Sequence, residues 1–259
     1  MSLSFEERRK YILEQLTRDE RVKVAELAEK FRVSTETVRR DLDRLEKDGI
    51  LKKVYGGAVK SRAEGWEPPF VSRAEMLAKE KETIGRLAAS LVKDGETVMI
   101  DHGTTTLEVL RYLGDRKHVT VVTHSVPLLL LAMEMFAGRI IFIGGEVSPR
   151  QQSVAGPIAE AMLKQLKVNK AFISVGGISL NEGITDYDLN EVSISRLMIE
   201  RAEEVVVLAD HTKFGKITFA NIAPLKDVSM IITDEQCPEE WMKKLTEKGI
   251  EVLVPVNLN

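Results

Sequence analysis

The stretch that decides the fold of the first sixty residues reads Val33-Ser34-Thr35-Glu36-Thr37-Val38-Arg39-Arg40-Asp41-Leu42 and continues through Leu45 to Gly49 and Ile50. Its apolar residues Val38, Leu42 and Leu45 fall on one stripe at helical spacing. Gly49 suits the left-handed position after a helix, where Ile50 can contact Leu45. The stretch therefore predicts an amphipathic helix that ends at a glycine stop.

Two helices precede this helix and a hairpin follows it. Apolar residues at helical spacing predict a helix behind Ser4 that ends near Thr17, and then a second, short helix. After the third helix, the runs Leu51–Tyr55 and Ala58–Lys60 flank Gly56-Gly57, which predicts two strands around a glycine turn. Three helices followed by such a hairpin predict a winged helix-turn-helix domain over residues 1–60.

The outward face of the third helix is the candidate DNA reader. At about 100° per residue, Arg40 lies opposite the apolar stripe, with Glu36 on one side of it and Thr37 on the other. Because the N-terminal part of a recognition helix meets the base edges, we expect these three residues to read bases. The alternative is an ordinary solvated helix face, since acidic residues interrupt the basic ones. The further candidates are Ser34, the expected N-cap, Thr35, Arg39, Arg44 and Lys47 on the helix, and Lys52, Lys53, Tyr55 and Lys60 in the hairpin.

Beyond residue 60 the pattern changes. The segment 61–75 contains Gly65, Pro68 and Pro69 without any period, which predicts a linker. A helix is expected over Lys79–Val92, and strand-like runs then alternate with helical stretches, which indicates parallel strands joined by right-handed crossovers. We therefore predict a Rossmann-like α/β domain over residues 76–259. Its expected strands are Val98–Ile100, Val119–Val122, Ile140–Ile143, Ala171–Ser174, Val205–Leu208 and Met230–Ile232.

Polar and glycine-rich motifs follow several of these strands. At the carboxyl edge of an open α/β sheet, helix N-termini offer free N–H groups that favour an anion. Gly103 lets the backbone approach a ligand, and the run Thr104-Thr105-Thr106 supplies hydroxyls and amides. Gly144-Gly145, after another strand, is expected to form a second phosphate cradle of the same kind. Asp101 is placed to accept hydrogen bonds from sugar hydroxyls, and Lys213 to neutralise a phosphate. For any one glycine alone, the alternative is a simple turn from strand to helix.

Histidines and acids near the same strand ends leave two alternatives open. The histidines could converge on a metal, but we expect them to donate hydrogen bonds to a sugar, and we predict no metal site. The acids could supply a general acid or base to an isomerase, or they could bind ligand and cap a helix, which we prefer. The residues concerned are His102, His124 and His211, and Asp186, Asp188 and Glu191, with Asp188 or Asn190 as the cap.

Composition and charge restrict the function classes. The chain has 259 residues, of which 44% are hydrophobic and 30% charged, values of a soluble globular protein. Residues 1–60 carry fifteen Lys and Arg against twelve Asp and Glu, whereas the remainder carries 22 against 28, so a mildly basic head precedes an acidic body. The apolar run Val126–Met133 is too short to span a bilayer, and we expect neither a secretory signal nor a membrane partner. The single cysteine, Cys237, excludes an internal disulfide.

The motifs resemble, in order and over nearly the whole chain, those of DeoR-family bacterial transcriptional regulators. The resemblance rests on the stretch 33–42, Leu45-Glu46-Lys47-Asp48-Gly49, Gly56-Gly57-Ala58, Asp101-His102-Gly103-Thr104-Thr105-Thr106, Thr123-His124-Ser125, Gly144-Gly145 and Leu208-Ala209-Asp210-His211-Thr212-Lys213-Phe214-Gly215. It implies a regulator, usually a repressor, that responds to a sugar phosphate and whose sensor fold is shared with sugar-phosphate isomerases and coenzyme A transferases. The implied effector contacts are Lys81, Asp101, Gly103, Thr104, Thr105, Thr106, His124, Ser125, Gly144, Gly145, Glu191, Asp210 and Lys213.

Two residues depart from the family pattern. Tyr55 stands where a histidine is common before the hairpin glycines, which bears on the hairpin's DNA contacts. Ser195 stands where many members have a lysine after the acidic residue matched by Glu191, which bears on the identity of the ligand.

These observations predict a cytoplasmic repressor of carbohydrate metabolism genes that binds a double-stranded operator and a phosphorylated sugar. One recognition helix reads too few base pairs to select a genomic site, so we expect a homodimer or homotetramer. We expect no cofactor and no catalytic residues. The alternative is a sugar-phosphate isomerase-like enzyme with an accessory DNA-binding head, and a weaker one is an adaptor that uses the winged helix for protein contacts.

Overall fold

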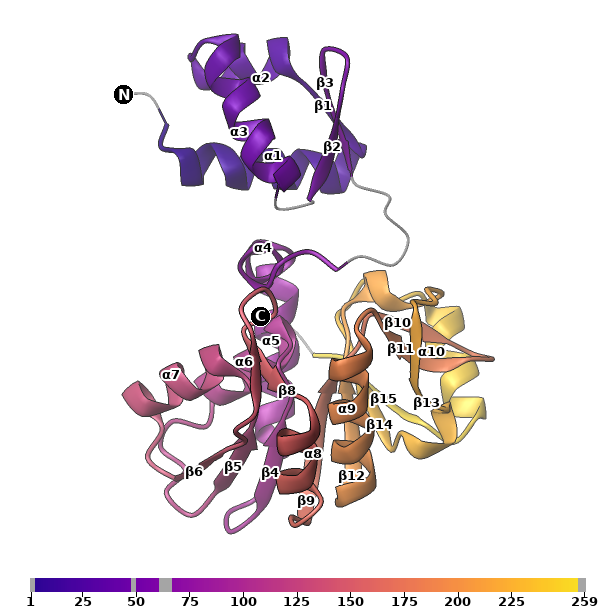
Figure 1. Cartoon of the computed structure of the whole chain (residues 1–259). Coiled ribbons are helices and arrows are strands. Elements are labelled where there is room, and N and C mark those ends of the chain that lie inside the picture. The colour runs from indigo at the N-terminus through magenta and orange to yellow at the C-terminus, as the bar shows by residue number, and fades with distance from the viewer. Residues whose placement is uncertain (1–2, 48–49, 61–66, 256–259) are drawn as a thin grey trace. The chain divides into compact units, whose positions relative to one another are not determined.

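The computed structural model describes residues 3–47, 50–60 and 67–255 of the chain (Figure 1). The chain divides into two compact units, residues 1–76 and residues 77–259, and each is described by itself. Within the described residues, no helix combines the length and the apolar character that crossing a bilayer requires.

The first unit contains three helices around one core, a small antiparallel sheet and a short fourth helix. The apolar stripes of its three helices meet in one core, where Ile12, Val38, Leu42 and Leu45 are fully buried. The strands lie in the order β1-β3-β2. The elements are α1 (Phe5–Asp19), β1 (Arg21–Lys23), α2 (Val24–Phe31), α3 (Thr35–Lys47), β2 (Leu51–Val54), β3 (Gly57–Lys60) and α4 (Phe70–Glu75).

Local hydrogen bonds explain where these helices begin and end. Ser4 and Glu7 form a capping box at the start of α1, and Ser34 Oγ accepts from the backbone N–H of Thr37 at 3.1 Å at the start of α3. Both N-caps expected from the sequence are confirmed. At the end of α3 the backbone N–H of Ile50 donates to the Leu45 carbonyl at 2.9 Å, the long hydrogen bond of a Schellman stop. The expected role of Gly49 lies outside the described residues.

The hairpin differs from the sequence prediction in one respect. Gly57 is not a turn residue, because it lies in β3 and pairs with Val54 on one side and Lys23 on the other. A Cβ on Gly57 would lie 2.1 Å from the Val22 carbonyl oxygen, so glycine is required for β1 to approach β3. Gly56, with φ of 79°, makes the turn. The strand β1 was not predicted, because its three residues are too few to show an alternating pattern.

The segment predicted to be a linker, 61–75, ends in a helix. Residues 61–66 lie outside the described part, and α4 occupies the last six positions. The side chains of Phe70 and Ser72 are buried, and Arg9 of α1 donates to Ser72 Oγ at 2.9 Å. Pro68 and Pro69 led to the prediction of a linker, but they directly precede α4, and Pro69 is its N-cap.

The second unit is built on a seven-stranded sheet in the order β15-β14-β12-β9-β4-β5-β6. Every pair of neighbouring strands in it is parallel, as the alternation of strands and helices predicts. All six strand runs predicted from the sequence lie in this sheet, which adds β15 at one edge. The strands are β4 (Thr97–Ile100), β5 (Thr120–Thr123), β6 (Arg139–Phe142), β9 (Val168–Ser174), β12 (Ala202–Leu208), β14 (Met230–Ile232) and β15 (Glu251–Leu253).

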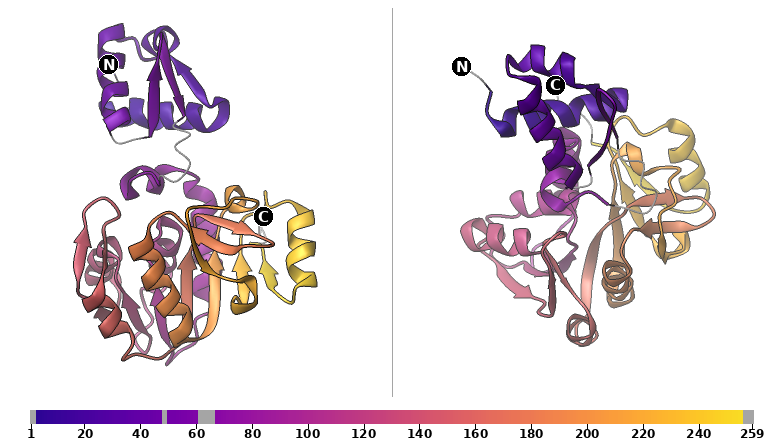
Figure 2. Two further views of the ribbon diagram at one scale, coloured as in Figure 1. Left: turned by 45° about the vertical axis from the view of Figure 1, so that its right-hand side comes forward. Right: turned by 45° about the horizontal axis from the view of Figure 1, so that its top comes forward.

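Helices cover both faces of this sheet (Figures 1 and 2). α5 and α6 pack on one face and α8 and α9 on the other, so the central strands are buried on both sides. The helices are α5 (Ala78–Ser90), α6 (Thr104–Arg111), α7 (Val126–Met135), α8 (Pro157–Leu163), α9 (Leu189–Arg201) and α10 (Glu239–Glu247), with 3-10 turns η1 (His211–Lys213) and η2 (Leu225–Asp227). Two small antiparallel sheets that the sequence did not reveal are β7 (Glu146–Ser148) with β8 (Ser153–Ala155), and β10 (Gly177–Ser179) with β11 (Gly183–Asp186) and β13 (Ala220–Ala223).

The register of the sheet aligns the predicted motifs along one edge. Ile100 at the end of β4 pairs with Thr123 at the end of β5 and with Phe172 of β9. The residues that follow these strand ends, from Asp101 in the centre to Asp210 after β12, therefore share the carboxyl edge of the sheet. This edge is where ligands bind in open α/β sheets.

Candidate functional site

The helix α3 presents an exposed, charged face. The side chains of Arg39 and Arg40 are 58% and 77% exposed, and each guanidinium lies 3.7 Å from a carboxylate oxygen of Glu36. Ion pairs this exposed contribute little to stability. The arginines can therefore leave Glu36 and bind a nucleic acid at a small cost in free energy. Thr37 is partly buried beside them, and Thr35 is exposed at the helix start. The predicted reading face is thus accessible.

The hairpin carries the other predicted DNA contacts. Tyr55 is fully exposed at the turn, and Lys52 is exposed on β2. Lys53 is engaged within the head, because its ammonium pairs with Asp43 and its backbone N–H donates to Glu46 Oε1 at 2.7 Å. The side chains of Lys47 and Lys60 lie outside the described part of the structure.

A buried ion pair holds the reading helix against α1. Arg8 Nε and Nη2 donate to the two carboxylate oxygens of Asp41 at 2.6 and 3.0 Å, and Arg8 Nη1 donates to the Leu3 carbonyl at 2.5 Å. Both side chains of the pair are almost fully buried. The hydrogen bond to Asp41 raises the pKa of Arg8 above its ordinary value. A second link is Arg44, whose guanidinium lies 4.8 Å from the centre of the Phe5 ring.

The sequence contained a signal for this pair. Arg8 lies between Phe5 and Ile12 at the spacing of the apolar stripe of α1, and Asp41 lies between Val38 and Leu45 in the same way on α3. A charge at a core-facing position needs a partner of opposite sign. Asp41 is therefore not part of a solvated face, as the alternative interpretation of α3 assumed.

In the second unit, cationic and hydroxyl groups gather at the carboxyl edge of the sheet. Gly103 is the N-cap of α6, so Thr104, Thr105 and Thr106 form its first turn, as expected for an anion cradle. A Cβ on Gly103 would lie 2.3 Å from that of Ser174, so the loop needs glycine there. Ser125 is the N-cap of α7 and accepts from the backbone N–H of Leu128 at 3.4 Å.

Two lysines act on one carboxylate at this edge. Burial opposes ionisation of Asp210, but the charges of Lys213 and Lys81 and the hydrogen bonds from Thr212 outweigh burial and lower the pKa of Asp210. Asp210 is the N-cap of η1, which contains Lys213. Lys81 is buried on α5, which packs against α6 (Figure 1). The structure thus brings the predicted lysines together near Asp210.

Gly144 and Gly145 do not repeat the cradle in the expected form. They follow the end of β6, but the next element is the strand β7 rather than a helix. No helix N-terminus follows them, since the chain turns there into the β7–β8 hairpin. A Cβ on Gly145 would lie 2.7 Å from the Ala155 carbonyl oxygen, so this glycine serves close packing of the hairpin.

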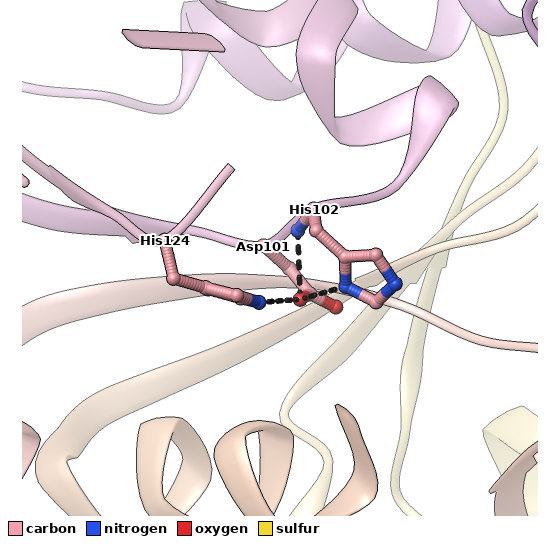
Figure 3. A group of neighbouring side chains, drawn as sticks. All are labelled: Asp101, His102 and His124. Carbon is pink, nitrogen blue, oxygen red and sulfur yellow. Dashed lines mark hydrogen bonds and ion pairs between the residues drawn. The ribbon is translucent and has the colours of Figure 1, made fainter. Parts of the chain in front are cut away.

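Four buried side chains form a polar cluster between the ends of β4 and β5 and helix α9 (Figure 3 shows three of them). Asp101 Oδ1 lies 2.9 Å from His102 Nδ1 and 3.4 Å from His124 Nε2. Glu191 Oε2 lies 3.5 and 3.6 Å from the same two nitrogens. Each of the four residues is at most 4% exposed in its side chain. We call these four residues the Asp101–Glu191 cluster.

The charge state of the two carboxylates follows from their neighbours. Burial opposes ionisation of Glu191, but the charges of His102 and His124 and a hydrogen bond from Ser153 lower its pKa to about 2. Asp101 is fully buried, and the same two histidines together with a hydrogen bond from Ser174 hold its pKa well below the ordinary value. Both acids are thus ionised in the folded protein.

The remaining histidine and acids have other partners. His211 does not join His102 and His124, because its Nδ1 lies 2.9 Å from Asp234 Oδ1. Asp188 is confirmed as the N-cap of α9, where it accepts from the backbone N–H groups of residues 190 and 191. Asp186 accepts from the backbone N–H of Tyr187 at 2.7 Å. Ser195, one turn after Glu191 on α9, is buried.

Comparison with known proteins identifies the family. The model of a DeoR-like helix-turn-helix domain matches residues 8–63, and that of a DeoR C terminal sensor domain matches residues 77–235. This chain belongs to the DeoR family. It joins a DeoR-like helix-turn-helix domain to a C-terminal sensor domain.

Relatives match this DeoR-family chain over most of its length. The HTH-type transcriptional regulator IolR of Bacillus subtilis is 36% identical over 96% of this chain and 98% of its own length. The transcriptional repressor AccR of Agrobacterium fabrum is 33% identical over 93% and 96%. Ribose 5-phosphate isomerase A of Methanocaldococcus jannaschii resembles the fold over 52% of this chain and 53% of its own, with 21% identity and a TM-score of 0.38. A likeness of that size carries no information about activity.

Proposed function

We propose that this DeoR-family protein is a repressor that binds operator DNA through residues 1–60 and releases it when residues 76–259 bind a phosphorylated sugar. The observation that carries the proposal is the exposed guanidinium of Arg40, held on a helix that a buried ion pair fixes to the rest of the head. A protein whose winged helix served only as an accessory would have no need of a basic reading face fixed in this way. Because its target is the chromosome, the protein acts in the cytoplasm.

On DNA, the proposal assigns base reading to Glu36, Thr37 and Arg40. Arg40 is suited to a bidentate contact with guanine, which is the commonest specific contact in the major groove. Arg39 and Lys52 are exposed and reach phosphates instead. Ser34 and Thr35 add contacts at the N-terminus of α3, and Tyr55 adds one at the hairpin turn.

In the sensor domain, the proposal places the phosphate of the effector at the first turn of α6, near Lys213 and Lys81. A phosphate carries a double negative charge, which a helix N-terminus and ammonium groups both favour. The sugar hydroxyls lie toward Ser125 and Asp210 at the same edge of the sheet. Asp101, His124 and Glu191 lie beside this proposed site, where they are buried and engaged with one another.

The isomerase alternative is less well supported. Of its candidate acids, Asp188 caps α9, Asp186 accepts from a backbone N–H, and Glu191 lies inside the buried cluster. A general acid or base must reach the substrate proton within hydrogen-bond distance. Incubation of the protein with sugar phosphates is therefore expected to give binding without product.

The proposal includes a homodimer or homotetramer whose contacts lie in the sensor domain. Leu130 and Met133 of α7 are 58% and 76% exposed, and Val147 of β7 is 57% exposed. Leu130 and Val147 line one groove together with Leu107 of α6. Apolar side chains gathered at a surface in this way favour association with a second copy.

A ligand screen tests the sensor part of the proposal. Thermal unfolding of the full chain is measured with a set of sugar phosphates and with the matching unphosphorylated sugars. At least one sugar phosphate should raise the unfolding temperature, because a ligand stabilises the state it binds, and Lys213→Ala should abolish that rise. Lys226→Ala, which removes an exposed lysine of η2, is the matched control and should keep it. An equal rise in Lys213→Ala and wild type would contradict the assigned phosphate site.

A further inference from the structure

The Asp101–Glu191 cluster has the composition and spacing of a metal site. It joins two imidazole nitrogens and two carboxylate oxygens in a region that solvent does not reach. We infer that Asp101, His102, His124 and Glu191 bind one divalent transition-metal ion, of which zinc is the expected one, as a structural centre of the sensor domain. This inference replaces the expectation from sequence that the histidines only donate hydrogen bonds, and it does not depend on the proposed effector.

The four carboxylate–imidazole separations of the cluster are close to those of four-coordinate geometry. At zinc–ligand bonds of about 2.0–2.1 Å, tetrahedral geometry places donor atoms about 3.3–3.4 Å apart. In the cluster, Asp101 Oδ1 lies 2.9 and 3.4 Å from the nitrogens of His102 and His124, and Glu191 Oε2 lies 3.5 and 3.6 Å from them. One donor atom each of Asp101, His102 and His124 lie within 4.8 Å of one another, whereas Glu191 does not lie within that limit of all three. A metal ion can be accommodated by these three side chains, and the Glu191 carboxylate must move to complete the tetrahedron.

Two donor atoms of the cluster lack a hydrogen-bond partner. His124 Nε2 and Glu191 Oε2 are fully buried, and neither makes a hydrogen bond to any described residue. Unpaired polar atoms in the interior cost about 1–3 kcal/mol each, so they call for an explanation. The two atoms face each other at 3.6 Å across the position where the ion would lie. Metal coordination satisfies both of them at once.

Serine residues bind the outer oxygen of each carboxylate, and the inner oxygen of Asp101, which also accepts the backbone N–H of His102 at 2.8 Å, keeps a second lone pair for the metal. Ser174 donates to Asp101 Oδ2 from its backbone N–H at 3.0 Å and from its hydroxyl at 2.7 Å. Ser153 donates its hydroxyl to Glu191 Oε1. The opposite oxygens, Asp101 Oδ1 and Glu191 Oε2, are the ones that face the imidazoles. Hydrogen-bonded outer partners of this kind orient the ligands of metal sites.

The charge of the cluster also favours a divalent cation. Two buried carboxylates bring two negative charges, and the ion pairs that they form within the described residues involve only His102 and His124. One divalent ion with two neutral imidazoles balances this charge. The donor set excludes Mg²⁺ and Ca²⁺, which prefer six or more oxygen ligands, and suits zinc, which accepts nitrogen and oxygen in a tetrahedron.

The site would join three parts of the sensor domain. Asp101 and His102 follow β4, His124 follows β5, and Glu191 lies on α9, on the opposite face of the sheet from α6. All four coordination positions are filled by the protein, as in structural zinc sites, which leaves no open position for a substrate. The ion would hold the strand ends rigid directly beside the first turn of α6.

Direct metal binding tests the inference. Untagged full-length protein is freed of metal with a chelator and titrated with Co²⁺ and then with Zn²⁺. We expect one equivalent of Co²⁺ to bind with the intense visible absorption of a four-coordinate ion, and Zn²⁺ to displace it. The unfolding temperature should rise with added Zn²⁺, because the folded state binds the ion. His124→Asn and Glu191→Gln should each lose the absorption, whereas His118→Asn, at an exposed histidine outside the cluster, should keep it.

Three other outcomes of these titrations would overturn the inference. If the wild-type chain takes up no Co²⁺ or Zn²⁺ at micromolar concentration, the cluster is a network of histidines and carboxylates without a metal. If His124→Asn binds as much Co²⁺ as wild type, the ion lies elsewhere. Weak absorption typical of six-coordinate Co²⁺ would contradict the four-ligand site. The wild-type titration decides even if a variant fails to fold, and it is independent of any response to a sugar phosphate.

Discussion

Single residues set the position of the reading helix. Arg8 donates two hydrogen bonds to the Asp41 carboxylate in the core of the head. Asp41→Ala leaves the guanidinium buried without its partner, so we expect a loss of about 3–5 kcal/mol in the free energy of unfolding and weaker DNA binding. Because a buried pair can be replaced by apolar residues, Arg8→Met with Asp41→Leu should recover much of the stability. Urea unfolding of the variants measures both effects, and a stable Asp41→Ala variant would contradict the role of the pair.

At the same scale, the proposed contacts divide into those that read bases and those that hold phosphates. Arg40→Ala should weaken binding to a specific site by about 1–3 kcal/mol and leave binding to random DNA nearly unchanged, as loss of a guanine contact does. Lys52→Ala should weaken both equally and reduce the dependence of affinity on salt. Fluorescence anisotropy with the two kinds of duplex distinguishes these cases. If Arg40→Ala lost equal affinity for both duplexes, Arg40 would not be a base-reading residue.

At the scale of elements, the hairpin depends on two glycines for different reasons. Gly56 has a positive φ of 79° and no atom within 4 Å of an added Cβ, so Gly56→Ala should cost only about 1–2 kcal/mol of strain. Gly57 has a backbone carbonyl 2.1 Å from that Cβ, so Gly57→Ala must separate β1 from β3 and should cost more. Thermal unfolding of the full chain compares the two variants. A milder effect of Gly57→Ala would contradict the packing described for β1.

Elements with a clear period could be predicted from the sequence, and short ones could not. The stripes of α1 and α3 and the apolar runs of the central sheet gave the fold class, which the structure confirms. Strands of three residues, such as β1, β7 and β8, show no period and form only because partners pair with them. The helix α4 was missed for a different reason, since its preceding prolines indicate a break.

The sequence predicted the separate motifs of the candidate site but not how they are combined. The motifs at Asp101, His124 and Asp210 follow strands, and parallel strands bring their carboxyl ends to one edge. The sequence suggested that His102 and His124 could converge, but not that Glu191 joins them and Asp101, because only the tertiary fold brings α9 to the ends of β4 and β5. The Gly144-Gly145 prediction was wrong about a following helix, since a glycine pair indicates a turn but not the element after it.

In the whole molecule, the proposed function requires that a ligand of the sensor domain changes the affinity of the head for DNA. A sugar phosphate can shift operator binding only by its different affinity for the DNA-bound and the free state. Lys213→Ala should therefore bind the operator as wild type does without ligand and fail to respond when ligand is added. Thr105→Ala should behave in the same way, because it removes a hydroxyl from the first turn of α6.

The most direct test is an operator titration of the full-length protein with and without sugar phosphate. The duplex is the sequence that the wild-type protein selects from random DNA, and the sugar phosphate is the one that raises the unfolding temperature. We predict tight, salt-sensitive binding that falls at least fivefold, or about 1 kcal/mol, when the sugar phosphate is added, with no fall in Lys213→Ala. Operator affinity that is the same with and without every sugar phosphate tested would contradict the account.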